Sequence, residues 1–152
     1  MNIYKLAKLN IAIGADHAGF ILKEDIKGYL ISKGYNIIDF GTNSSEPTDY
    51  PEYGHKVAIS VQSGESERGM TMCGSGNGIN MTVNKYPGIR SALCWKKEIA
   101  VLARQHNDAN ICALPARFIS KEEAFDIADA FLDTKFEGGR HERRIKKIPI
   151  DL

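Results

Sequence analysis

Hydrophobic and polar positions alternate along this chain between short apolar runs and longer segments with helical periodicity. The apolar runs cover residues 9–15, 36–40, 68–73, 90–94 and 110–114, and we expect these five segments to be strands. The periodic segments cover residues 20–33, 52–63, 79–85, 97–105 and 120–132, where apolar spacing predicts helices. Gly34 is placed to end the first helix, and Ser120 with Glu123 forms a capping box that opens the last of these.

This regular alternation of strands and helices predicts the fold class. Consecutive βα units favour a parallel sheet with helices on both faces, so we expect a Rossmann-like three-layer α/β/α sandwich with a five-stranded parallel sheet. With 152 residues the chain is long enough for one sizeable core, and we expect a single domain over residues 1–152.

Charge and composition exclude several classes of partner. Lys and Arg number 20 against 19 Asp and Glu, so the net charge gives no general reason to bind nucleic acid or a membrane surface. No apolar run approaches the roughly 20 residues of a membrane-spanning helix, and residues 1–8 lack the apolar stretch of a signal peptide. The chain has three cysteines, a small and odd number that does not suit a disulfide framework. This cysteine usage favours a location in the reducing cytoplasm.

The most informative segment is residues 68–78, an apolar run that ends on a cysteine and enters a glycine-rich turn. Glycines in that turn let backbone N–H groups face a ligand, and the helix that follows favours anions and the thiolate form of a nearby cysteine. This loop therefore offers a base and an anion site together, a combination that points to an enzyme. The residues are Cys73, Gly74, Ser75, Gly76, Asn77 and Gly78.

Each part of this loop also has a structural interpretation. A glycine-rich turn between strand and helix is common in α/β proteins, and a free cysteine is among the most buried residue types. Cys94 and Cys112 lie in strand-like runs without such a turn, and we interpret both as core. The loop lacks the Gly-x-Gly-x-x-Gly spacing of dinucleotide-binding turns and the lysine of a P-loop, and the chain has no Cys-x-x-Cys pair. Only the position of Cys73, at the end of a strand, singles it out.

Polar side chains follow other predicted strands as well. Asp16 and His17 come directly after the first strand, and Arg117 comes shortly after the fifth. Because ligands of open α/β sheets bind at the carboxyl ends of the strands, these residues are candidates to share a site with Cys73. A lone histidine after a strand often has only a structural role. A functional role is favoured here because His17 is expected on the same sheet edge as a cysteine and a glycine-rich loop.

Two further groups of polar residues lie near helix ends. His106 closes the fourth helix, where it could simply complement the helix dipole. Arg140 and Arg144 come after two glycines and are spaced i,i+4, so a helix there would present both guanidinium groups on one face. Such a pair could bind a phosphate group or could simply form a solvated surface. No residues have the spacing of metal ligands. The whole set suits metal-free proton transfer beside a carbonyl, with backbone donors holding the enediolate.

Several motifs together resemble a known family. They are residues 14–20 (GADHAGF), 39–42 (DFGT), 45–51 (SEPTDYP), 104–108 (RQHND) and 138–141 (GGRH). With the Cys73 loop, they make nearly the whole chain similar to type B ribose-5-phosphate isomerases, of the sugar-phosphate isomerase family that includes the galactose-6-phosphate isomerase subunits. The galactose enzymes lack the Asp-His pair and the loop cysteine, so the resemblance favours the pentose isomerases.

The resemblance implies a cofactor-free interconversion of D-ribose 5-phosphate and D-ribulose 5-phosphate, with allose 6-phosphate as a side substrate. It makes Cys73 the proton acceptor, and His106, with Asp16 nearby, the donor for ring opening. Residues 74–78 would hold the enediolate oxygens, with Ser75 in the place of a hydroxyl often seen there, and Asn107 would bind the sugar. Phosphate would be bound by His17, Arg117, Arg140 and Arg144.

The family also implies assembly into a homodimer, or a tetramer of two dimers, with each active site shared between subunits. His106 and Asn107 would then reach the neighbour's Cys73 loop. Ile79 occupies the position where some relatives carry a glutamate base, which places this chain in the cysteine-using branch, and Pro115 stands where relatives often have glycine.

Two rival functions come from other classes. A nucleotide-binding oxidoreductase would suit the fold but needs the missing glycine fingerprint. A nucleic-acid or protein-binding module would rest on the basic residues 140–147, a short stretch interrupted by Glu142.

Overall fold

A single five-stranded parallel sheet forms the centre of the protein in the computed structural model, which describes residues 8–151. The spatial order of the strands is β2-β1-β3-β5-β4. Their bounds are β1 Asn10–Ala15, β2 Asn36–Asp39, β3 Arg68–Cys73, β4 Ser91–Leu93 and β5 Ile111–Pro115. The predicted five-stranded parallel sheet is confirmed, and each strand lies within two residues of its predicted ends.

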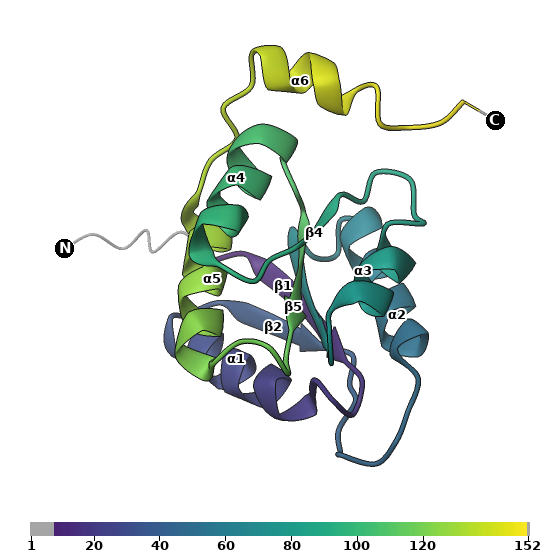
Figure 1. Ribbon diagram of the computed structural model, residues 1–152, viewed down its shortest axis with the longest axis vertical. Coiled ribbons are helices and arrows are strands. Elements are labelled where there is room, and N and C mark those ends of the chain that lie inside the picture. Colours follow the sequence, from purple (N-terminus) through teal and green to yellow (C-terminus); the bar gives the residue numbers. More distant parts are fainter. Residues whose placement is uncertain (1–7, 152) are drawn as a thin grey trace.

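Helices cover both faces of this sheet, as predicted for a three-layer sandwich (Figure 1). On one face lie α1 (Phe20–Ser32), α4 (Lys97–Asn107) and α5 (Lys121–Asp133), and on the other α2 (Tyr50–Gln62) and α3 (Asn77–Val83). The short helix α6 (Arg140–Ile145) stands at one end of the molecule, against α4. No helix within residues 8–151 has the length and apolar character needed to cross a membrane.

The burial of each strand follows its place in the sheet. In the central strands β1, β3 and β5, nearly every side chain is buried, because helices pack on both faces, whereas the edge strands β2 and β4 are only half-buried. Cys94 and Cys112 are fully buried, which confirms that they belong to the core. The predicted capping box is also present: the Ser120 Oγ accepts from the Glu123 N–H at 3.1 Å, and the Glu123 carboxylate accepts from the Ser120 N–H at 2.8 Å.

Helices α2 and α3 each begin two residues earlier than predicted, and α4 ends two residues later. Helix α2 starts at Tyr50 instead of residue 52, since Pro51 is well tolerated in the first turn of a helix. Helix α4 continues to Asn107, where Asp108 adopts a left-handed backbone with φ 46° and ends it. The last turn of α4 therefore contains His106 and Asn107.

A buried ion pair fixes the end of β2 beside the end of β1. The side chain of Lys23 is fully buried, and its Nζ lies 2.7 Å from the Asp39 carboxylate, which also lies 2.9 Å from Lys27. The same carboxylate accepts from the Gly41 N–H at 2.9 Å, and the Gly41 carbonyl accepts from Ala15. Burial raises the pKa of Asp39, but the hydrogen bonds from the two lysines and Gly41 outweigh it and leave this pKa below its ordinary value.

The Asp39→Asn variant should lower the free energy of unfolding by about 3 kcal/mol at neutral pH, because it removes the less exposed of the two carboxylates that pair with the buried Lys23 ammonium and leaves only Glu24, at 2.7 Å. Since the folded pKa is depressed, this contribution is complete above the unfolded carboxyl value of about 3.9 and is lost as the pH falls through the lower folded value. Urea unfolding of the unaltered protein and of Asp39→Asn should therefore show a difference in the free energy of unfolding at pH 7 that disappears in acid. Asp126→Asn, at an exposed site on α5, is the control; an equal loss there would contradict this role of Asp39.

Candidate active site

The carboxyl ends of two adjacent central strands bring Asp16 and Cys73 together. Asp16 directly follows β1, Cys73 ends β3, and the Asp16 N–H donates to the carbonyl oxygen of Met72 at 3.3 Å. Both side chains are nearly buried, at 7% and 4% exposure. Parallel pairing of neighbouring strands therefore places Asp16 and Cys73 at adjacent strand ends on the same edge of the sheet.

A tight turn after Asp16 holds its carboxylate in place. The Asp16 Oδ1 accepts from the Gly19 N–H at 3.1 Å. A Cβ atom at Gly19 would lie 2.5 Å from the Met72 carbonyl oxygen, so only glycine lets this turn approach the backbone of β3 so closely. The contact is made one residue before Cys73, so the turn that holds the Asp16 carboxylate packs directly on the end of β3.

The glycine loop after Cys73 is packed closely by neighbouring elements. Gly76 has φ 76°, a left-handed conformation that favours glycine, and a Cβ there would lie 2.5 Å from Leu93. A Cβ at Gly78 would lie 2.5 Å from the ring of Tyr50. Ser75 and Asn77 are exposed, and the Ser75 Oγ accepts from the Asn77 N–H at 3.3 Å. The two intervening polar residues are therefore left at the surface, where a ligand can reach them.

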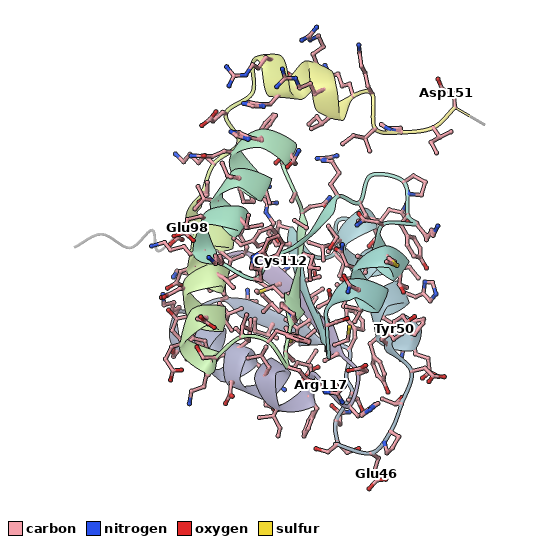
Figure 2. The ribbon with its side chains drawn as sticks, in the orientation of Figure 1. Glu46, Tyr50, Glu98, Cys112, Arg117 and Asp151 are labelled. Atoms are coloured by element: carbon pink, nitrogen blue, oxygen red, sulfur yellow. The ribbon has the colours of Figure 1, made fainter. Side chains whose placement is uncertain are left out.

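Two side chains flank this loop at the same end of the molecule, where Figure 2 labels Arg117 and Tyr50. A Cβ at Gly74 would lie 3.1 Å from the Arg117 guanidinium, and the Arg117 N–H donates to the Gly74 carbonyl at 3.0 Å. Pro115 precedes this arrangement at the end of β5 and leaves the guanidinium against the loop. Tyr50 received no role from the sequence, although it lies in the 45–51 motif, because only the fold shows its ring packed on Gly78.

His17 lies beside the segment before α2. Its Nδ1 is 3.1 Å from both the backbone nitrogen and the carbonyl oxygen of Thr48, and the Thr48 hydroxyl lies 2.9 Å from that of Tyr53. The imidazole is half-buried and held through one nitrogen, which leaves the other for a ligand.

The remaining predicted residues lie at the opposite end of the sheet. Helix α4 runs back from the end of β4 to the start of β5, so His106 and Asn107 lie near the amino ends of the strands, with α6 and its Arg140 and Arg144 beside them (Figure 1). From Lys97 to His106 the helix rises about 14 Å. Within one chain, therefore, the structure does not bring these four residues to Cys73.

A second cluster of polar side chains surrounds His106. Its ring stacks on that of His141 with centroids 4.2 Å apart and planes 12° apart. His141 Nε2 lies 3.5 Å from the Glu137 carboxylate. Burial, with the electrostatic influence of His106 and Arg140 nearby, lowers the pKa of His141. Asn107 is held through its carbonyl oxygen, which accepts from the Arg90 Nε at 2.8 Å.

This cluster differs from the expectation of no metal-ligand grouping. The possible ligand atoms of His106, Glu137 and His141 lie within 4.8 Å of one another. The spacing of 31 and 4 residues gave no signal, because the fold and not the local sequence brings the last turn of α4 against α6.

Two cavities of the described residues also lie toward this end of the molecule. One of about 400 Å³ runs between the segment before β4 and the C-terminal segment, where it is lined by Tyr86, Ile89, Ile145 and Ile148. The other, of about 300 Å³, shares Ile89, Arg90 and Ile148 with it and also reaches Asn107. Neither is lined by Cys73 or its glycine loop.

Comparison with known proteins places this fold and site in a family. Residues 11–148 match the family model of the Ribose/Galactose Isomerase family. Ribose-5-phosphate isomerase B of Escherichia coli K12 is 47% identical over 138 residues, which cover 91% of this chain and 93% of the relative. The structure of ribose-5-phosphate isomerase B from Clostridium thermocellum superposes with a TM-score of 0.91 at 48% identity, covering 92% of this chain and 95% of the other.

A further solved structure contains a sugar phosphate. It is ribose-5-phosphate isomerase B from Mycoplasma genitalium with bound ribulose-5-phosphate, 42% identical, with a TM-score of 0.87 and coverage of 91% of this chain and 93% of the other. The fold and these relatives thus define an α/β sugar-phosphate isomerase. The chain belongs to the Ribose/Galactose Isomerase family, as its motifs suggested.

Proposed function

We propose that this protein interconverts D-ribose 5-phosphate and D-ribulose 5-phosphate. The observation that carries the proposal is the placement of the Cys73 thiol beside Asp16 and the glycine loop at the carboxyl edge of the sheet, in a chain 42% identical to a relative that binds ribulose-5-phosphate. The galactose branch is disfavoured because Asp16, His17 and Cys73 are all present.

The proposed reaction needs one base and one anion site. The Cys73 thiolate removes the proton from C2 of the open-chain aldose, the electron pair forms the C1–C2 double bond, and the carbonyl oxygen gains negative charge. Backbone N–H groups of residues 74–78 stabilise that enediolate. The C2 hydroxyl proton passes to the C1 oxygen, the thiol returns its proton to C1, and the C2–O bond becomes the ketone, so protons and electrons balance and no metal or cofactor takes part.

We further propose that each site is completed by a second copy of the chain. His106 would donate the proton that opens the sugar ring, Asn107 would bind the sugar, and Arg140 and Arg144 would bind the phosphate together with His17 and Arg117. The opposite placement of the two groups within one chain supports a homodimer, or a tetramer of such dimers. The C-terminal segment supports it too, because Ile148 and Ile150 are 56% and 80% exposed beside an apolar cavity.

Direct assay of ribose 5-phosphate tests the function. We expect conversion to ribulose 5-phosphate by purified protein, with competitive inhibition by a sugar phosphate that mimics the enediolate. Absence of turnover, combined with tight nicotinamide nucleotide binding, would favour the oxidoreductase instead, and salt-dependent RNA binding would favour the nucleic-acid module. The three free cysteines suit the reducing cytoplasm, where we propose that the enzyme acts.

Allose 6-phosphate is proposed as a side substrate, because it keeps the aldehyde and phosphate ends and adds one hydroxymethylene. The ratio of kcat/KM for the two sugars, measured with one preparation, tests this extension.

Arg140→Ala and Arg144→Ala should each raise KM for ribose 5-phosphate about tenfold or more and change kcat less, because each guanidinium supplies charge-assisted hydrogen bonds worth roughly 1.5–3 kcal/mol. Within residues 8–151 neither arginine forms an ion pair, so each is available to a ligand. Arg143→Ala, one residue away on the same exposed helix, is the matched control. If KM in Arg140→Ala and Arg144→Ala is no higher than in the control, these arginines do not bind the phosphate.

Activity should survive exhaustive treatment with EDTA, because the proposed base and donors are all protein groups. Turnover is measured before and after dialysis against the chelator, with metal content determined in parallel. Inactivation that added divalent metal reverses would contradict the metal-free mechanism.

A further inference from the structure

The stacked histidines at the end of α4 form, with a neighbouring carboxylate, a group that resembles a metal-binding site. His106, Glu137 and His141 each offer one ligand atom, and these atoms lie within 4.8 Å of one another. Two bonds of 2.0–2.1 Å at a tetrahedral angle place ligand atoms roughly 3.4 Å apart. The His141 Nε2 to Glu137 carboxylate distance of 3.5 Å already matches this value.

The backbone holds these ligands at fixed relative positions. The Glu137 N–H donates to the Gln105 carbonyl at 3.1 Å, which ties the segment before α6 to the last turn of α4. The His141 N–H donates to the Gly138 carbonyl at 3.1 Å, which sets the start of α6. The backbone of Glu137 is therefore anchored to the residue that precedes His106, and His141 follows it at the start of α6.

We propose that His106, Glu137 and His141 bind a divalent transition-metal ion such as zinc, with water as the fourth ligand. Two imidazole nitrogens and one carboxylate oxygen form a donor set that zinc accepts in proteins. Because imidazole lone pairs lie in the ring plane and the two rings are stacked, His106 must rotate to turn its nitrogen toward the ion. His106 is half-buried in the last turn of its helix, where a side-chain rotation of this kind is possible.

The charges around the cluster give this metal site a moderate affinity, and its use of His106 makes it inhibitory. Arg140 and Arg144 lie on the same short helix as His141 and oppose a cation, while Glu137 supplies the negative charge among the three ligands. A zinc ion held there occupies the His106 imidazole. If His106 opens the sugar ring, a role that rests on the proposed function, zinc binding inhibits the isomerase.

Metal binding is tested without reference to activity. Untagged protein is titrated with zinc chloride by calorimetry, and with cobalt(II) by visible absorption, where a thiolate charge-transfer band would report binding at a cysteine instead. We expect one ion per chain without that band. Affinity should fall at least about tenfold in Glu137→Gln and in His141→Ala. Glu142→Gln is the matched control, since it removes an exposed carboxylate from the same helix, and it should bind as the unaltered protein does.

Three outcomes would contradict the proposed metal site. Unchanged zinc affinity in Glu137→Gln, whose side chain is half exposed and whose loss should not disturb folding, would place the ion elsewhere, as would a thiolate band. No saturable binding by the unaltered protein would also overturn it. His141→Ala is checked for a native melting transition first.

Inhibition is then measured as a separate effect. Zinc should inhibit ribose 5-phosphate conversion and EDTA should restore it, with the inhibition constant raised at least about tenfold in Glu137→Gln relative to Glu142→Gln. Binding without inhibition would keep the metal site but remove His106 from the reaction. If the protein showed no isomerase activity, the proposed function would be wrong, but calorimetry would still test whether the metal site exists.

Discussion

Cys73→Ala should lower kcat for ribose 5-phosphate about a thousandfold or more, because a positioned general base contributes 10² to 10⁴ and no other thiol of residues 8–151 reaches this loop. Sugar-phosphate binding should remain close to normal, since the proposed phosphate ligands are untouched. Steady-state kinetics with direct ligand titration separates the two effects. Cys73→Ser should also be nearly inactive, because a hydroxyl at this position is a much weaker base.

Cys94→Ala provides the matched control for this loss. Cys94 is fully buried, and its Sγ contacts the carbonyl oxygen of Ala92, so its removal affects core packing and leaves the glycine loop intact. We expect near-normal kcat with a modest loss of stability. Near-normal turnover in Cys73→Ala would remove the cysteine as the base and direct attention to Asp16, the carboxylate nearest along the sheet edge.

Mixing two inactive variants should restore activity if the sites are shared. Cys73→Ala and His106→Ala are unfolded together and refolded in equal amounts, so that random pairing makes about half of the dimers hybrid. Each hybrid carries one doubly altered site and one unaltered site. About a quarter of the normal activity should therefore return, from a starting level near zero.

The controls for this experiment distinguish shared sites from failed mixing. Each variant refolded alone should remain inactive, and native mass spectrometry should show the hybrid dimer. If hybrids form and no activity returns, each chain must hold its own complete site, although the rise of about 14 Å along α4 between Lys97 and His106 argues against this. A monomer in solution would also contradict the shared-site proposal.

Local sequence signals determined most elements and one half of the candidate site. Apolar runs predicted the strands because both faces of β1, β3 and β5 are covered, and the capping box at Ser120 was visible because its two partners are three residues apart. The Cys73 loop and Asp16 were also predictable, because in a parallel sheet the residues that follow the strands all emerge at one edge.

The tertiary structure decided how these parts are placed. The strand order β2-β1-β3-β5-β4 puts β3 between β1 and β5, and this alone brings Asp16, Cys73 and Arg117 to neighbouring positions. It also places Tyr50 on Gly78, a contact between residues 28 positions apart that no local pattern encodes.

His106 shows the same limit at the other end of the sheet. The sequence marked it as a helix-terminal histidine, and the resemblance gave it a role. Only the direction of α4, which runs back to the amino end of β5, separates it from Cys73 within one chain. Only the contact between α4 and α6 stacks it on His141 beside Glu137. Short-range periodicity records which face of a segment is buried, whereas these contacts depend on how whole helices and strands pack, so they became visible only in the folded chain.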